Sequence, residues 1–394
     1  MNDELFIIKE NVLIKHNPTE DAQIKVPDGV EAIGNFAFRN LSSDTMSVVL
    51  PDSVKKLHAS AFEKSKWLTD ITLPASLRKI EPAVFKDCTK LSTIEIPVGV
   101  KIIDCEAFEN CTSLTEIEIP AKVTSIGAYA FCGCSELENI VLPESLKSIG
   151  YGAFMNCKKL ETIVLPRSLK RLHPHAFDGC SNLKSIIIPP SVQKVGKGCF
   201  IDCYNLGSLI ISEGVQKLGE KAFANCIALT ELNLPDSLTK LGENAFESCI
   251  NLKSATIGEG LSSLPAGAFT NCTALLEVIL PHSLTRIEKY AFSACRNLYS
   301  VSLPRGLRYI GWDAFAHCAI DTAEIPVSVK RVEEGTFFNC RNLKTVILSS
   351  HTRYISRLAF AGCPPELVLY CPDGSYAEKF ARRNKIHYKN FCDE

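Results

Sequence analysis

The sequence predicts a β-rich repeat solenoid, in which one short unit of the chain recurs and the copies stack. Two observations lead to this fold class. A frame of 23 residues recurs between residues 24 and 363, and each copy is marked by a phenylalanine that usually follows an alanine. Each copy also carries two small or aliphatic positions that are two residues apart. A unit of this length cannot bury a core alone, so neighbouring copies must share one.

Residues 137–157, LENIVLPESLKSIGYGAFMNC, show the frame in full. The marker phenylalanine occurs fifteen times at steps of 23 residues, apart from one step of 24 after Phe38 and one of 22 after Phe315. Both changes fall before the next strand, where a loop can absorb them. The markers are Phe38, Phe62, Phe85, Phe108, Phe131, Phe154, Phe177, Phe200, Phe223, Phe246, Phe269, Phe292, Phe315, Phe337 and Phe360.

Two short strands are expected in every copy. Ile140 and Leu142 stand fourteen and twelve positions before their marker, which is the period of a strand with one face inward. Pro143 ends this strand, because proline cannot donate a hydrogen bond to the ladder. Ile149 belongs to a second short strand. The glycine that often follows it, such as Gly150, is expected to permit the turn into the Ala-Phe segment.

The pattern divides the chain into three regions. Residues 1–23 precede the first clear copy, and we expect them to form an N-terminal cap over the otherwise open sheet edge. The solenoid is predicted over residues 24–363, with about fifteen copies, and a C-terminal cap over residues 364–394.

The C-terminal cap has its own signals. The segment LVLYCP predicts one last strand after the final copy. Ser375 can cap a short helix over residues 376–383, and residues 386–388 are expected to add a final strand.

The frame L-x-x-I-x-I-P-x-x-V-x-x-I-G-x-x-A-F-x-x-C resembles the BspA-like leucine-rich repeat family over residues 24–363. The closing segment GSYAEKFARRNKIHY is similar to the cap that ends many arrays of that family. The resemblance implies a right-handed solenoid with a parallel sheet on one face, and turns or short helical segments elsewhere. It also implies kinship with mostly bacterial proteins, several of which are surface proteins that bind host proteins or other cells.

Charge and hydropathy exclude some classes of partner. Forty-three basic and 44 acidic residues leave a net charge of −1, so no overall charge draws the chain to nucleic acid or to a membrane surface. No stretch approaches the roughly 18 to 20 apolar residues of a membrane span. The acidic start MNDEL does not resemble a secretory signal, so we expect a cytoplasmic protein, with export by a leaderless route as the alternative. A monomer is expected.

The cysteines form a column. Thirteen of the 18 stand three residues after a marker, and Leu41 and Ser65 hold that place in the first two copies. We expect a ladder of small buried thiols, while disulfides and a metal site remain alternatives. Cys392, near the tail, is predicted to be the most reactive thiol. The ladder comprises Cys88, Cys111, Cys134, Cys157, Cys180, Cys203, Cys226, Cys249, Cys272, Cys295, Cys318, Cys340 and Cys363.

No catalytic motif stands out. The sequence has no G-x-S-x-G, P-loop or H-E-x-x-H motif, and its eight histidines show no ligand spacing. The acidic residues are scattered over outward positions. We therefore expect neither an enzyme nor a bound cofactor or metal.

One outward column is apolar in four successive copies. Between the two inward positions of the first strand stand Val141, Val164, Ile187 and Ile210, preceded by Glu95 and Glu118 and followed by Asn233 and Thr256. This strip is a candidate site for docking a protein partner. The other explanation is the ordinary preference of strands for β-branched residues.

A second outward column is basic. It could attract a polyanion or an acidic glycan, although solvated lysines that prevent edge pairing are the other explanation. The candidate polyanion-binding residues are Lys147, Lys170, Arg171, Lys194, Lys217 and Lys240. The same column continues through Lys55, Lys56, Arg78, Lys79, Arg286, Arg308, Lys330, Arg331 and Arg353.

Together these patterns predict a non-enzymatic scaffold for protein–protein interaction, or an adhesin-like binding protein, with its partner on the strand face. Given the family resemblance, the partner could be a host or cell-surface protein. The alternative is polyanion or glycan binding through the basic column, whereas nucleic acid is not expected.

Overall fold

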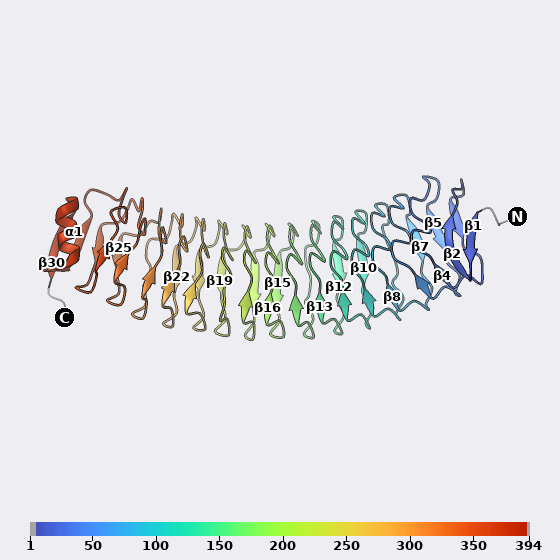
Figure 1. Cartoon of the computed structure of the whole chain (residues 1–394), viewed down its shortest axis with the longest axis horizontal. Coiled ribbons are helices and arrows are strands. Elements are labelled where there is room, and N and C mark those ends of the chain that lie inside the picture. The colour runs from blue at the N-terminus through green and yellow to red at the C-terminus, as the bar shows by residue number, and fades with distance from the viewer. Residues whose placement is uncertain (1–4, 392–394) are drawn as a thin grey trace. The chain divides into compact units, whose positions relative to one another are not determined.

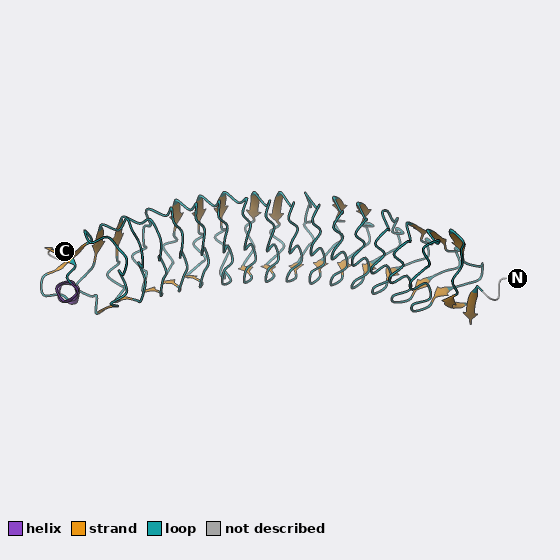
Figure 2. Cartoon of the chain, turned by 90° about the horizontal axis from the view of Figure 1, so that it is seen from above, coloured by secondary structure: helices purple, strands orange, loops and turns teal. Residues whose placement is uncertain are grey.

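The computed structural model describes residues 5–391 and divides into two compact units, Met1–Leu206 and Gly207–Glu394. Within each unit, successive coils of the chain stack, and two rows of short strands run along the stack (Figures 1 and 2). Strands in neighbouring coils pair in parallel, as Ile117 does with Ile140, one repeat later. The predicted β-solenoid is confirmed. The segments around the marker phenylalanines are turns and not helices.

Unit 1 carries its first strands on one face, each ending in or near a proline corner. They are β3 (Gln23–Lys25), β5 (Ser47–Val49), β7 (Asp70–Thr72), β10 (Glu116–Glu118), β12 (Asn139–Val141) and β15 (Ser185–Ile188). The second strands are only two residues long. They are β4 (Ala32–Ile33), β6 (Lys56–Leu57), β8 (Lys79–Ile80), β9 (Ile102–Ile103), β11 (Ser125–Ile126), β13 (Ser148–Ile149), β14 (Arg171–Leu172) and β16 (Lys194–Val195).

Unit 2 repeats this arrangement. Its first strands are β17 (Ser208–Ile211), β19 (Glu231–Asn233), β20 (Ser254–Thr256), β22 (Glu277–Ile279), β25 (Thr322–Glu324) and β27 (Thr345–Ile347). Its second strands are β18 (Lys217–Leu218), β21 (Ser263–Leu264), β23 (Arg286–Ile287), β24 (Tyr309–Ile310), β26 (Arg331–Val332) and β28 (Tyr354–Ile355).

The core is built around the marker phenylalanines. Phe154 is fully buried, and its ring lies 5.4 Å from that of Phe131 and 5.3 Å from that of Phe177, within 6° of parallel. Ring separations in this range are typical of offset-stacked aromatic pairs, which add about 0.5–1.5 kcal/mol to the burial term. The markers therefore hold the coils together as well as filling them.

The cysteine ladder lies beside the rings. The thiol of Cys157 is fully buried and donates to the backbone oxygen of Phe131 at 3.2 Å. Ser65, in the same place of an earlier coil, is also buried and donates its hydroxyl to the oxygen of Phe38 at 2.6 Å. The predicted burial of this column is confirmed from Cys88 to Cys340, whereas Cys363, in the last coil, is only partly buried. Cys392 lies outside the described residues.

The turns beside each marker contain left-handed residues, and these are not the glycines that were predicted to permit the turn. Gly127 and Gly150 do not have positive φ angles. A Cβ on Gly150 would instead come within 2.6 Å of the backbone carbon of Gly127 in the coil before. The left-handed residues stand two positions before and two after the marker, as Glu106 and Asn110 do around Phe108, with φ of 58° and 59°. Asn, Asp and Gly are frequent there because they tolerate this region well.

The N-terminal end is an antiparallel hairpin of β1 (Phe6–Lys9) and β2 (Val12–His16), which Figure 1 shows beside the first coils. β2 also pairs in parallel with β4, so it supplies a second strand to the ladder. The ring of His16 lies 5.2 Å from that of Phe38 and continues the stack. Burial lowers the pKa of His16, so the stacked ring is kept neutral.

The C-terminal end is closed by a helix and two long strands. Helix α1 (Tyr376–Asn384) begins at Ser375, whose hydroxyl accepts from the N–H of Glu378, as predicted. β29 (Val368–Pro372) pairs in parallel with β30 (His387–Phe391), which contains part of the predicted final strand. Phe380 of the helix packs against Phe360 with ring centroids 6.4 Å apart. Among the described residues, no helix is long and apolar enough to cross a membrane.

Candidate functional site

The apolar strip of unit 1 lies on the outer surface of the first strands. Val141, Val164 and Ile187 are 69%, 80% and 56% exposed. Their neighbours along the chain, such as Ile140 and Ile163, are buried, so the alternation predicted for a half-buried strand holds. Ile210, the fourth predicted residue, is exposed in unit 2.

Backbone pairing sets the register of the strip. In the parallel pair of β10 and β12, Val141 lies in register with Glu118 of the preceding coil. A bridge between Thr162 and Ser185 places Val164 level with Ile187, because each stands two residues further along its chain segment. Equivalent residues in neighbouring coils are about 4.8 Å apart. The three side chains therefore form a continuous aliphatic surface.

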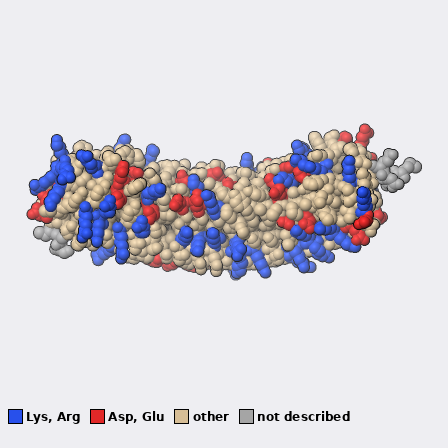
Figure 3. Space-filling view, in the orientation of Figure 1, with Lys and Arg blue, Asp and Glu red and all other residues tan. Residues whose placement is uncertain are grey.

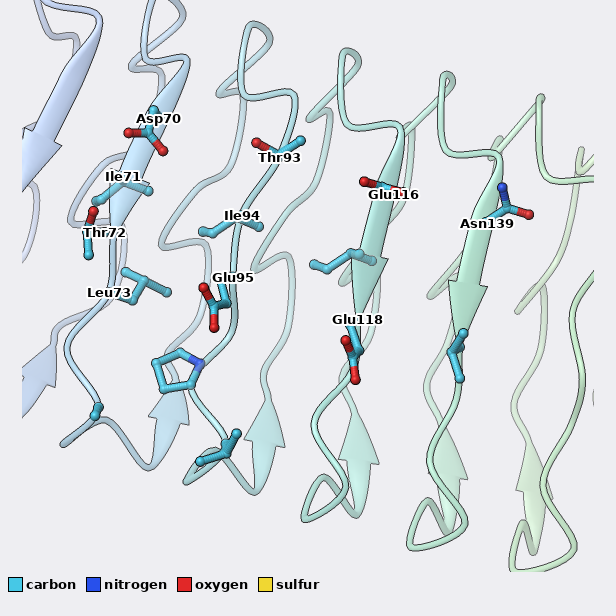
Figure 4. A pocket seen from close by; sticks show the side chains of 15 residues that line it. Asp70, Ile71, Thr72, Leu73, Thr93, Ile94, Glu95, Glu116, Glu118 and Asn139 are labelled. Carbon is cyan, nitrogen blue, oxygen red and sulfur yellow. The ribbon is translucent and has the colours of Figure 1, made fainter.

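A groove adjoins this strip in unit 1, and sequence interpretation did not foresee it. It has a volume of about 1000 Å³ and crosses four successive coils, from β7 to β12; the second of these coils, at residues 93–95, runs between β7 and β10 without forming a strand. Val141 lines the groove and also belongs to the strip. Figure 4 shows Asp70, Thr93, Glu116 and Asn139 in one row across these coils.

The groove is acidic. Figure 4 shows Glu95 and Glu118 in a second row, at the opposite ends of the strands from Asp70 and Glu116. All four carboxylates are exposed. Within residues 5–391, no ion pair is formed by any of them. The groove therefore combines uncompensated negative charge with the apolar edge that Val98, 77% exposed, and Val141 provide.

A signal for the groove was present in the sequence. Glu95 and Glu118 precede the apolar strip in the same outward column, and Asp70 and Glu116 stand two positions earlier in their strands. Two acidic rows on the outward face of one sheet predict a negative surface. Concavity could not be seen, because it depends on how the coils curve and where their loops stand.

The predicted basic column separates into two in the structure. Arg171 and Lys194 pair in register within strands β14 and β16, together with Ser148 of β13. Lys147 and Lys170 stand one residue earlier, outside these strands, and the N–H of Lys170 donates to the oxygen of Lys147. These four exposed residues therefore lie in two adjacent columns of unit 1, whereas Lys217 and Lys240 lie in unit 2.

Acidic neighbours neutralise the basic column in some coils only. Lys79 contacts Asp104 at 2.7 Å and Glu81 at 2.8 Å, and the hydrogen bonds that its ammonium donates to these carboxylates raise its pKa. The six candidate polyanion-binding residues have no ion pair within the described part of the chain. Polyanion binding by these six residues stays a prediction.

Residues 5–391 contain no group of three or more His, Cys, Asp or Glu side chains arranged to hold a metal ion. The ladder thiols are poor nucleophiles, because burial raises the pKa of Cys249 and of Cys340 to about 12. Cys132, partly exposed, has a pKa raised by burial to about 11. These cysteines therefore contribute to the packing of the solenoid and not to a reactive site.

Comparison with known families agrees with this geometry. The family model described as BspA type leucine rich repeat region, in six copies, matches residues 16–115, 101–227, 193–285 and 262–373. The chain belongs to the BspA-type leucine-rich repeat family. None of the curated proteins compared with the chain matches it.

Two solved structures share the fold. A leucine-rich repeat protein from Bacteroides ovatus is 25% identical, with a TM-score of 0.78 over 98% of this chain and 97% of its own. The pneumococcal vaccine antigen PcpA is 18% identical, with a TM-score of 0.51 over 98% of this chain and 96% of its own. A leucine-rich cell surface protein from Faecalibacterium prausnitzii is 20% identical, with a TM-score of 0.48 over 98% and 96%.

Proposed function

We propose that this leucine-rich repeat chain is a non-enzymatic protein-binding scaffold, and that its partner docks on the first-strand face of unit 1. One observation carries the proposal. The exposed aliphatic strip of Val141, Val164 and Ile187 is continuous, through Val141, with a groove of about 1000 Å³. Contiguous apolar surface beside a concave polar region marks interaction sites in soluble proteins.

The charge of the groove defines the partner. Asp70, Glu95, Glu116 and Glu118 are exposed and lack ion pairs among the described residues. A partner with lysine or arginine side chains would supply the missing counter-charge, and complementary potentials of this kind favour specific association. The fitting partner is an extended polypeptide segment that presents basic side chains to the groove and apolar side chains to the strip.

The scaffold also favours binding by its rigidity. The outward side chains stand on strands whose inward neighbours are locked in the core, as Ile140 is beside Val141. A surface that is already ordered loses little conformational entropy when a partner binds. The proposed docking face therefore needs no rearrangement of its backbone.

Calorimetric titration with a synthetic peptide that alternates lysine and valine tests the proposal. We expect saturable binding, and no binding of a peptide with glutamate for lysine. Replacing Val164 and Ile187 by serine (V164S/I187S) removes the apolar contact without adding charge, and E95Q/E118Q removes the counter-charge. Each double variant should weaken binding about tenfold, which corresponds to about 1.4 kcal/mol.

The matched control is N233S/T256S, which changes equivalent outward positions in strands β19 and β20 of unit 2. It should bind the basic peptide as the native chain does. Equal affinity of V164S/I187S and the native chain would refute the strip, and equal affinity of the lysine and glutamate peptides would refute the charge argument.

Polyanion binding through the basic column remains the alternative prediction. Binding of heparin that persists at physiological ionic strength, and that is lost when Lys170, Arg171 and Lys194 are replaced by glutamine, would support it over protein docking.

A further inference from the structure

Unit 2 holds a second hollow, on the side of its second strands. It has a volume of about 610 Å³ and lies between the coils of β24, β26 and β28. In the orientation of Figure 3, basic side chains predominate toward the C-terminal end of the chain. The residues that line the hollow are Arg308, Tyr309, Val327, Ser328, Lys330, Arg331 and His351.

The cations around this hollow are of two kinds. Arg331 donates to Glu333 at 2.7 Å, and its guanidinium lies over the ring of Tyr354 at 4.1 Å. Arg308 and Lys330 are exposed and have no ion pair or side-chain hydrogen bond within the described residues. They occupy equivalent places in successive coils, so two uncompensated positive charges stand at the rim.

A third uncompensated cation extends this group. The N–H of Arg353 donates to the oxygen of Lys330 at 2.8 Å, which places Arg353 in the next coil of the same column. Equivalent backbone positions in adjacent coils are about 4.8 Å apart. Like charges on neighbouring coils repel one another, and a bound anion would relieve the repulsion.

The lining is rich in donors and poor in acceptors. Arginine and lysine side chains offer N–H donors only. The hydroxyl of Ser328, which also lines the hollow, shares its one proton between the backbone oxygens of Arg305 and Leu307. No carboxylate lines the hollow, and the nearby Glu333 is paired with Arg331. The site thus favours an anion with several acceptor oxygens.

We propose that this hollow binds a phosphate monoester group carried on a larger molecule. A carboxylate would compensate one of the two rim charges, whereas a phosphate monoester has a charge of about −1.5 to −2 and three acceptor oxygens. Arg308 can bind two of these oxygens through its planar fork, and Lys330 can bind the third as a point charge. The hollow exceeds the size of the phosphate itself, and Val327, 54% exposed, offers apolar contact to the carrier.

Titration calorimetry with glucose 6-phosphate, against glucose as control, tests the proposal. Saturable binding of the phosphorylated sugar is expected, with affinity falling as salt is added. In R308Q/K330Q the affinity should fall about tenfold or more. Since both side chains are exposed and unpaired, the thermal unfolding midpoint of this variant should match that of the native chain.

The matched control is K253Q/R296Q, which removes one exposed lysine and one exposed arginine of unit 2 that lie outside both the hollow and the basic column. It should bind glucose 6-phosphate like the native chain. A phosphoserine peptide and its unphosphorylated form make a second arm, and the tighter of the two phosphorylated probes identifies the carrier. The proposal is overturned if neither phosphorylated probe binds, or if R308Q/K330Q binds as tightly as the native chain. Either result leaves the docking face of unit 1 untouched.

Discussion

Inward and outward positions of the same coil obey different constraints. The inward Phe154 and Cys157 have no solvent exposure: the ring of Phe154 stacks on the equivalent rings of both adjacent coils, and the thiol of Cys157 donates to the backbone oxygen of Phe131. The outward Val164, only ten residues after Phe154, is 80% exposed. The inward residue types hardly vary from coil to coil, whereas the outward column passes from glutamate through valine to isoleucine and asparagine.

This difference separates stability from recognition. The residue type at an inward position is constrained by packing against the preceding and the following coil, so a substitution there disturbs several coils. An outward side chain meets solvent and one neighbour on each side, so it can vary without unfolding the stack. The acidic groove, the apolar strip and the basic hollow all lie at outward positions. The predictions below test that separation, beginning with the largest effect.

Alkaline pH should destabilise the inward ladder as a whole. Burial raises the pKa of Cys249 from 9.0 to about 12, so the folded chain retains protons that the unfolded chain loses between these values. The contribution of the protonated thiol to the free energy of unfolding is therefore fully present below pH 9. It is lost as the pH rises toward 12, by about 1.4 kcal/mol per pH unit for each such thiol. Urea unfolding measured across this pH range checks the slope.

The contribution of one thiol can be isolated with Cys249→Val, which has no proton to lose. Lysine and tyrosine titrations are common to both proteins, so the difference between the two slopes belongs to Cys249. Identical slopes for the native chain and the variant would show that the thiol is accessible to water.

Removing one inward ring should cost more than any outward change. Phe154→Ala leaves a cavity between Phe131 and Phe177, and substitutions of this kind typically lower the free energy of unfolding by about 3–5 kcal/mol. Val164→Ala, in the outward column, should stay within about 0.5 kcal/mol of the native value. Urea unfolding of the two variants measures both. Comparable losses would contradict the separation of inward from outward positions.

Inward positions were also the ones that the sequence could predict. Repetition of Phe, Cys and the aliphatic pair made the core visible, because stacking forces the same residue type into the same place. Turn geometry was less visible. The left-handed residues beside each marker could not be predicted, because residue types as different as Glu106, Asn110 and Tyr129 take that conformation.

Outward features were predicted only in part. The strip at Val141 and the basic column could be read from residue identity, yet the groove and the hollow could not. They depend on which neighbours neutralise a charge, as Glu333 does for Arg331 while leaving Lys330 uncompensated. Which charges pair depends on the positions of side chains in neighbouring coils, and the repeat pattern of the sequence does not specify these positions.

A conservative change in the cysteine ladder should have a moderate effect. Ser65 already replaces the thiol in one coil and donates to the oxygen of Phe38, so Cys157→Ser should cost about 1 kcal/mol or less. Cys157→Leu adds volume between tightly stacked coils and should cost about 1–3 kcal/mol. Thermal unfolding of both variants shows which substitution lowers stability more. If serine proves worse than leucine, then volume is not what limits this position.

The smallest stability effect is expected where the proposed function lies. V164S/I187S removes two β-branched side chains from solvent-exposed strand positions, and the loss of strand propensity should lower the free energy of unfolding by about 1 kcal/mol or less. The same substitutions should weaken peptide binding about tenfold. Urea unfolding and calorimetry on one preparation compare the two effects. A large loss of stability would mean that the strip belongs to the packing of the solenoid, and the docking face would have to be sought in the acidic groove alone.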